Sequence, residues 1–256
     1  MQKNFKQIPF SHKSDFLLRI LKLASIFTLS SIWLYYLVIT LPPNSSNTKI
    51  TFPKSFSQLH DLSELLKNYS QSHFYLVLLL FCSAYLYKQA FAIPGSVFLN
   101  ILSGALYGPI YGTLITSIFS AIGASCCYLF SKHIFGVLIT FYFNDTVTKI
   151  KSTINKQKQN GSLFNVLLSL RFFPCSPNWL MNMSAPLCGV PIKVFSLSVG
   201  VGLVPYNYIC AQAGDVVSSI ESVDQLLTFN VLVSFVFMAF VALVPVIYKR
   251  SREQQK

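Results

Sequence analysis

The residues that could do chemistry are few, and the most conspicuous is a lone cation. Arg171 stands in an otherwise apolar stretch. A charge at the centre of a bilayer costs at least about 2.5–3.5 kcal/mol on insertion scales. Two interpretations of Arg171 stay open. The side chain can snorkel so that its charge stays at the membrane surface, or its guanidinium can contact a phosphate at the mouth of a polar groove.

Side-chain amides accompany this arginine. Asn178 and Asn182 are four residues apart, so they share one face if the segment is helical. Asn100 and Ser103, from an earlier segment, are candidate partners for them. These groups can bond backbone that prolines have freed from helical pairing, or they can hydrate a groove, and both roles can hold together.

Carboxylates are missing from the same part of the chain. No Asp or Glu occurs between Glu64 and Asp145, or between Asp145 and Asp215. Hydrolases and transferases need clustered acids, bases or a bound metal. The four histidines are scattered, and the six cysteines fall in apolar segments without a CxxC pair. We therefore predict no enzyme activity, no metal site and no cofactor.

The elements that must position these residues lie in a membrane. Of 256 residues, 53% are hydrophobic and 11% are charged, and the mean hydropathy is +0.53. Soluble domains carry about 25% charged residues. We predict an all-α polytopic membrane protein, a helical bundle.

The net charge of +12 does not require a nucleic-acid partner. The bases gather at the predicted membrane edges, in residues 1–22, in 144–160 and after Lys249. The positive-inside rule accounts for that distribution. We predict that all three basic regions are cytoplasmic and that the chain binds no nucleic acid.

Framework helices are predicted at both ends. The apolar run Phe16–Leu41 is longer than the roughly 7–15-residue core of a cleavable signal, so we expect a signal-anchor helix. A second, short helix is expected over 74–87, and a last one over 226–248. Between the first two we expect a polar lumenal loop, 42–72, whose asparagines Asn44 and Asn68 stand in glycosylation sequons.

The middle of the chain is apolar but broken. All eleven glycines lie between Gly95 and Gly214, and irregular backbone at membrane depth survives only inside protein or beside a water-filled cavity. We predict two hairpins, 91–108 and 163–190, each followed by a span, 111–131 and 193–211. The expected breaks are Pro94, Gly95, Gly104, Gly108, Pro109, Pro174, Pro177, Pro186 and Pro191.

These features give a three-part organisation. Residues 1–73 form the basic N-terminus, the anchor helix and the lumenal loop, and 74–215 form the working membrane domain. Residues 216–256 contain most of an acidic lumenal loop (213–228), the last helix and the basic tail. The short aromatic segment 134–143 is expected as an interfacial helix that leads into a basic cytoplasmic loop, 144–160. The duplicated hairpin-and-span pattern is typical of inverted repeats in transporters.

Two motifs carry a family resemblance. The first runs from Phe91 to Leu99 and on through Ile101–Tyr107. The second comprises Arg171–Pro174, Pro177–Trp179, Asn182, Pro186, Val190–Pro191, Lys193–Phe195 and Ala213–Gly214. Together they resemble the transmembrane protein 41 family, part of the VTT-domain (DedA-like) superfamily that includes vacuole membrane protein 1. The match covers about residues 74–215.

The resemblance implies two re-entrant hairpins that face each other, residence in the endoplasmic reticulum, and phospholipid scrambling that supports autophagosome and lipoprotein formation. It also implies membrane-protein partners of the autophagy machinery. This chain departs from the bacterial relatives in lacking the membrane carboxylates thought to couple their transport to protons.

We therefore expect an energy-independent phospholipid scramblase whose headgroup path uses Arg171, Asn178, Asn182, Asn100 and Ser103. The alternative is an ion-coupled secondary transporter of a small or lipid-linked solute. A third class, a membrane scaffold without transport activity, also stays open. The sequence does not determine the oligomeric state or the preferred lipid.

Overall fold

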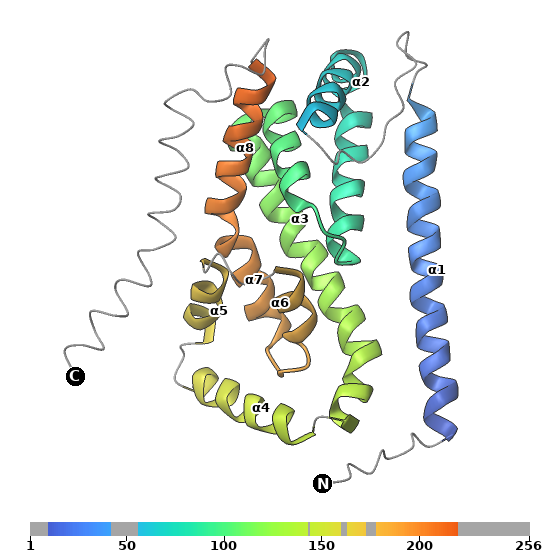
Figure 1. Cartoon of the computed structure of the whole chain (residues 1–256), viewed down its shortest axis with the longest axis vertical. Coiled ribbons are helices and arrows are strands. Elements are labelled where there is room, and N and C mark those ends of the chain that lie inside the picture. Colours follow the sequence, from blue (N-terminus) through green and yellow to red (C-terminus); the bar gives the residue numbers. More distant parts are fainter. Residues whose placement is uncertain (1–9, 42–55, 143, 160–162, 173–177, 220–256) are drawn as a thin grey trace, which may run out of the picture.

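A computed structural model describes residues 10–41, 56–142, 144–159, 163–172 and 178–219. These residues form helices and no strand, which confirms the all-α prediction (Figure 1). The helices are α1 (Phe10–Thr40), α2 (Phe56–Ala90), α3 (Ser96–Tyr142), α4 (Asn144–Gln159), α5 (Leu163–Phe172), α6 (Asn178–Ser184), α7 (Ile192–Gly202) and α8 (Val204–Ser219).

Three helical segments of the described chain are long and apolar enough to cross a membrane: Phe16–Thr40, Ser96–Ile134 and Ile192–Val216. The first confirms a long apolar helix where the anchor was predicted. Many of its large apolar side chains are exposed, among them Leu29 and Tyr35, at 66% and 68%. An apolar face of this size is expected to contact lipid.

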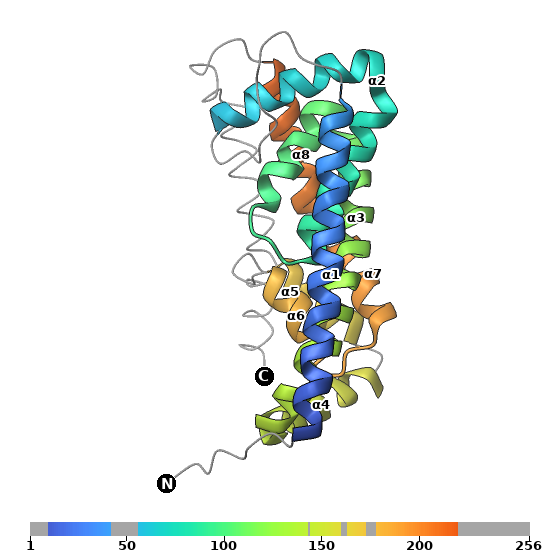
Figure 2. The same cartoon turned by 90° about the vertical axis from the view of Figure 1, so that its right-hand side faces the viewer.

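Helix α2 corrects the predicted polar loop. Residues 56–72 are helical, and a kink at His73 (φ −136°, ψ 48°) separates them from the predicted second helix. This first part lies across one end of the bundle (Figure 2). Leu59, Leu62 and Leu66 recur at helical spacing and are buried, so the segment is an amphipathic helix that covers the core.

The predicted hairpin over 91–108 is wrong in its bounds: the hairpin in α3 joins 96–107 to 109–142, although its break lies at Gly108, as predicted. The backbone there has φ 75° and ψ 169°, a conformation that favours glycine. Pro109 follows at the start of the second arm, where a missing N–H costs little. The arms 96–107 and 109–142 then pack together, because a Cβ at Gly112 would lie 2.8 Å from the Ser103 carbonyl oxygen.

Gly104, expected as a break, is helical instead. Its role is close packing: a Cβ there would overlap the carbonyl oxygen of Ala211 on α8. Gly214 repeats the arrangement, because a Cβ there would overlap the carbonyl oxygen of Ile101. The first arm of α3 and α8 therefore meet backbone to backbone.

The other predicted breaks fall at helix boundaries where they are described. Pro94 and Gly95 precede α3, Pro186 lies in the turn after α6, and Pro191 directly precedes α7. Pro174 and Pro177 lie outside the described residues, as does the predicted last helix. The re-entrant character of the hairpins and their inverted relation stay predictions.

The span predicted over 193–211 consists of two helices. A turn at Leu203 separates α7 from α8, just before Pro205, which cannot donate a backbone hydrogen bond. Helix α8 then continues to Ser219, so the beginning of the predicted acidic loop, including Asp215, is helical.

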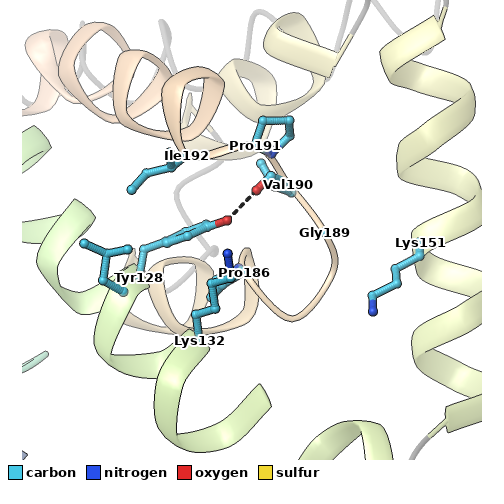
Figure 3. Close-up of a pocket in the computed structure, with 9 residues that line it drawn as sticks. Tyr128, Lys132, Lys151, Pro186, Gly189, Val190, Pro191 and Ile192 are labelled. Carbon is cyan, nitrogen blue, oxygen red and sulfur yellow. Dashed lines mark hydrogen bonds between the residues drawn. The ribbon is translucent and has the colours of Figure 1, made fainter. Parts of the chain in front are cut away.

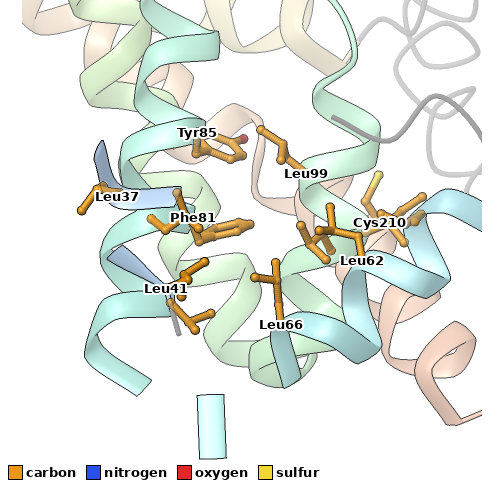
Figure 4. Packing of buried hydrophobic residues seen from close by; sticks show 13 residues of the cluster. Leu37, Leu41, Leu62, Leu66, Phe81, Tyr85, Leu99 and Cys210 are labelled. Carbon is orange, nitrogen blue, oxygen red and sulfur yellow. The ribbon is translucent and has the colours of Figure 1, made fainter. Parts of the chain in front are cut away.

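Two hydrophobic clusters hold the bundle together. One joins α1, α2, α3 and α8 through Phe81, Tyr85, Leu99 and their neighbours (Figure 4). The other is built on α3, α5 and α7, and Phe195 and Val199 are its most buried large members. The candidate polar groups lie beside these two clusters.

The ends of the bundle differ. Helix α4 and the Phe10 end of α1 lie at one end, and the first part of α2 lies at the other (Figure 1). Arg19 links α1 to this end of α3 by donating to the carbonyl oxygen of His133 at 2.7 Å. The basic segment 144–159, predicted as a loop, is the helix α4 and lies at the same end as the Phe10 end of α1.

Candidate functional site

The polar candidates form two separate groups, and the first is a buried network between α2, α3 and α8. The Asn100 amide donates to the Asn207 side-chain oxygen at 3.0 Å, and Asn207 donates to Ser117 at 3.0 Å. The Tyr85 hydroxyl donates to the Asn100 oxygen at 2.9 Å and pairs with Ser120 at 2.7 Å. These contacts satisfy the amide groups of both asparagines.

Asn100 and Ser103 are fully buried, at 1% and 0% exposed. Ser103 donates to the carbonyl oxygen of Asn100 in its own helix. No described hydrogen bond joins either residue to Asn178 or Asn182. The geometry therefore gives Asn100 and Ser103 a fastening role between the first hairpin and its neighbours.

The second group, the arginine cluster, comprises Arg171, Asn178, Phe195 and Ser198. The Arg171 Nη1 donates to the Asn178 side-chain oxygen at 2.7 Å, and Nε donates to the Ser198 hydroxyl at 3.3 Å. The guanidinium carbon lies 5.1 Å from the centre of the Phe195 ring, which is a cation–π contact. Every one of these partners is neutral.

One face of α7 receives the Arg171 side chain. Phe195, Ser198 and Gly202 lie three and four residues apart, so they line up along the helix. A Cβ at Gly202 would come within 3.0 Å of the Arg171 Cδ. The missing side chain thus leaves room for the arginine stem, and Ser198 and Phe195 then fix its head.

The arginine cluster has spare hydrogen-bonding capacity. The Arg171 Nη2 is buried and has no partner among the described residues. On the same helix as Asn178, Asn182 is 2% exposed, and its side-chain oxygen also lacks a described partner. The Arg171 Nη2 donor and the Asn182 oxygen acceptor are thus available to a ligand. In the network around Asn207, by contrast, the amide groups of both asparagines already have hydrogen-bond partners.

Sequence reasoning missed several of these residues. It singled out neither Asn207, Tyr85, Ser117 and Ser120 in the network nor Ser198 in the cluster. A signal existed for Asn207, because a lone amide in an apolar span needs a partner. Nothing local identified Tyr85 or Ser198, since their partners come from other helices.

A small basic pocket lies near the arginine cluster, with a volume of about 350 Å3. Tyr128 and Lys132 of α3, Lys151 of α4 and the turn before α7 line it (Figure 3). The Phe195 ring that contacts Arg171 also packs on Tyr128, with centroids 5.2 Å apart. An aromatic pair therefore lies between Arg171 and the pocket.

No group of three or more His, Cys, Asp or Glu residues within the described ranges could hold a metal ion. The arginine cluster and the basic pocket both carry positive charge without a described acidic partner. Their common chemistry is attraction of an anion, and the arginine fork in particular suits phosphate oxygens.

Comparison with known proteins gives a consistent set of relatives. The family model of the VTT domain matches residues 93–216, which include the arginine cluster and every named residue of the buried network except Tyr85. Transmembrane protein 41B of Danio rerio is 30% identical over 238 residues, which are 92% of this chain and 84% of that protein. The human protein of the same name is 26% identical, with coverage of 92% and 81%.

A more distant organism contributes a similar match. The transmembrane protein 41 homolog of Dictyostelium discoideum is 29% identical over 202 residues, which are 79% of this chain and 60% of that protein. No solved structure gives a significant match.

Proposed function

Since this chain belongs to the transmembrane protein 41 family of VTT-domain membrane proteins, we propose that it is an energy-independent phospholipid scramblase of the endoplasmic reticulum. Phospholipids are its substrates, and membrane proteins of the autophagy machinery are its partners. Its cellular role is lipid redistribution during autophagosome formation.

The state of Arg171 carries the proposal. The barrier to lipid crossing is the desolvation of a charged headgroup, since an unpaired charge in an apolar medium is very costly. The neutral partners of Arg171 leave its positive charge uncompensated, and its Nη2 has no described partner. A headgroup phosphate that reaches this position gains a charge-assisted hydrogen bond.

The remaining polar groups have two different roles in this proposal. Asn178 accepts a hydrogen bond from the arginine, and Asn182 lies one helical turn further along α6, so both supply amide contacts along the path. Asn100 and Ser103 keep the first hairpin in place from inside the bundle. We therefore restrict the headgroup path to Arg171, Asn178 and Asn182.

Two sequence features favour passive movement over driven transport. The sequence contains no GxxxxGK[ST] nucleotide motif, and no Asp or Glu lies between Asp145 and Asp215. Ion-coupled transporters commonly use membrane carboxylates in proton relays. Equilibration of lipid without an energy source is the behaviour that fits.

The test is reconstitution of the purified chain into liposomes that carry a fluorescent phospholipid in both leaflets. Dithionite bleaches only the outer leaflet, so empty vesicles keep about half of the signal. A scramblase brings the signal close to zero without nucleotide or gradient. Retention of half the signal in protein-containing vesicles would show that the proposal is wrong. In a separate assay, accumulation of a solute driven by a pH or sodium gradient would favour the ion-coupled transporter.

A further inference from the structure

The basic pocket between α3, α4 and α7 has a lining suited to an anion. Lys132 and Lys151 approach it from different helices, and both side chains are exposed (Figure 3). The remaining lining residues are uncharged: Tyr128, Leu129, Pro186, Gly189, Val190, Pro191 and Ile192. The pocket therefore contains two positive charges and no carboxylate.

The walls of the pocket are held in position. The Tyr128 hydroxyl donates to the Val190 carbonyl oxygen at 2.7 Å, which ties α3 to the turn before α7. Gly189 takes a positive φ of 78° in that turn, and a Cβ there would lie 3.5 Å from the Lys151 Cγ. The lysine stem thus runs along the turn and keeps its ammonium group at the pocket.

An apolar stripe leads to the pocket along α3. Leu114, Ile118, Ile122 and Leu129 are all exposed, at 53%, 55%, 46% and 41%. Their spacing of four, four and seven residues places them on one face of the helix. Leu129 itself lines the pocket, and Lys132 follows it within one turn. Apolar surface and cationic pocket are therefore continuous.

We propose that this pocket binds the anionic headgroup of a phospholipid whose acyl chains lie along the α3 stripe. Two lysines attract the negative headgroup, and the stripe explains why the ligand is a lipid rather than a soluble phosphate. The site goes beyond scrambling, because it is a binding site at the edge of the bundle and needs no crossing of the membrane.

The test measures binding to the purified full chain in detergent by microscale thermophoresis. The probe is dioctanoyl phosphatidylserine, compared with dioctanoyl phosphatidylcholine and with glycerophosphoserine, which has the same headgroup without acyl chains. We expect tightest binding of dioctanoyl phosphatidylserine. Each lysine near a lipid charge contributes about fivefold, so the double variant K132Q/K151Q should bind this probe about 25-fold more weakly.

The matched control is K156Q/K158Q, which removes the same charge from exposed positions of α4 outside the pocket. This control should keep the affinity of the unmodified chain. If both double variants bound dioctanoyl phosphatidylserine equally weakly, the loss of affinity would come from general surface charge, and the proposal would be overturned. Equally tight binding of glycerophosphoserine would assign the pocket to a soluble anion and overturn it too. The assay involves no transport, so its outcome is independent of scrambling activity.

Discussion

Among single residues, Arg171 combines two features that usually exclude each other: its guanidinium is mostly enclosed by α6 and α7, yet its described partners are all neutral. A buried cation is normally paired with an acid, because desolvation of an unpaired charge is costly. That cost has a functional explanation if a phosphate supplies the missing negative charge. Two variants at this site separate geometry from charge.

Replacement of Arg171 by Lys should slow scrambling, because a lysine cannot bond Ser198 and Asn178 and still present a fork to phosphate. We expect R171K and R171L to fold and to scramble roughly tenfold more slowly or worse, since a hydrogen bond to a charged group contributes about 1.5–3 kcal/mol. The measurement is the dithionite rate per monodisperse protein. R19K is the control, because Arg19 lies outside the arginine cluster. Near-normal rates in R171K and R171L would remove Arg171 from the path.

The substitution N178D tests the charge alone. It keeps the shape of the side chain that accepts from Arg171 at 2.7 Å but adds a carboxylate. We expect stability to be preserved and scrambling to fall by roughly tenfold, because the guanidinium is then neutralised and attracts phosphate less. An N178D protein that scrambles at the normal rate would contradict a role for uncompensated charge.

At the scale of helices, the predictable features were those with a local cause. Gly108-Pro109 forced a break because few other residues take that backbone conformation. The helix over 56–72 was not predicted, because the polar composition of the segment indicates a loop. The spacing of Leu59, Leu62 and Leu66 is the helical signal that this composition obscured. The partners of Asn100 were beyond sequence reasoning, because Asn207 is 107 residues away and only packing brings it close.

The contact between α3 and α8 gives a prediction for helix packing. G104A and G214A should each lower the melting temperature by roughly 5 °C or more, because overpacking costs typically about 1–3 kcal/mol. The control is G200A, whose Cβ would lie 3.5 Å from the Ala121 Cβ, an ordinary contact. The readout is thermal unfolding in detergent. If all three variants melted alike, the backbone-to-backbone contact would not be limiting.

For the whole molecule, the distribution of charge defines an orientation. Basic residues of α4 share an end with the start of α1, and the first part of α2 lies at the opposite end. From the positive-inside rule we predict that the α4 end is cytoplasmic. The arginine cluster and the basic pocket both lie in the half of the bundle near α4, on the cytoplasmic side in this orientation.

Impermeant maleimide checks this orientation. We expect a cysteine at K158C to react when only the plasma membrane is permeabilised, because Lys158 is exposed on α4. A cysteine at D61C, exposed at the other end of the bundle, should react only after the internal membranes are opened. The unmodified chain gives the background from native cysteines. The reverse pattern would invert the topology.

The bond between Asn100 and Asn207 also has a consequence for biosynthesis. At roughly 5–20 residues per second, a ribosome needs roughly 5–20 s to make the 107 residues between the two partners. During that interval the first hairpin has been made, but Asn207, the hydrogen-bond partner of its Asn100 amide, has not. The hairpin therefore cannot reach its final buried state at the moment of synthesis, and α8, the last described helix to emerge, completes it.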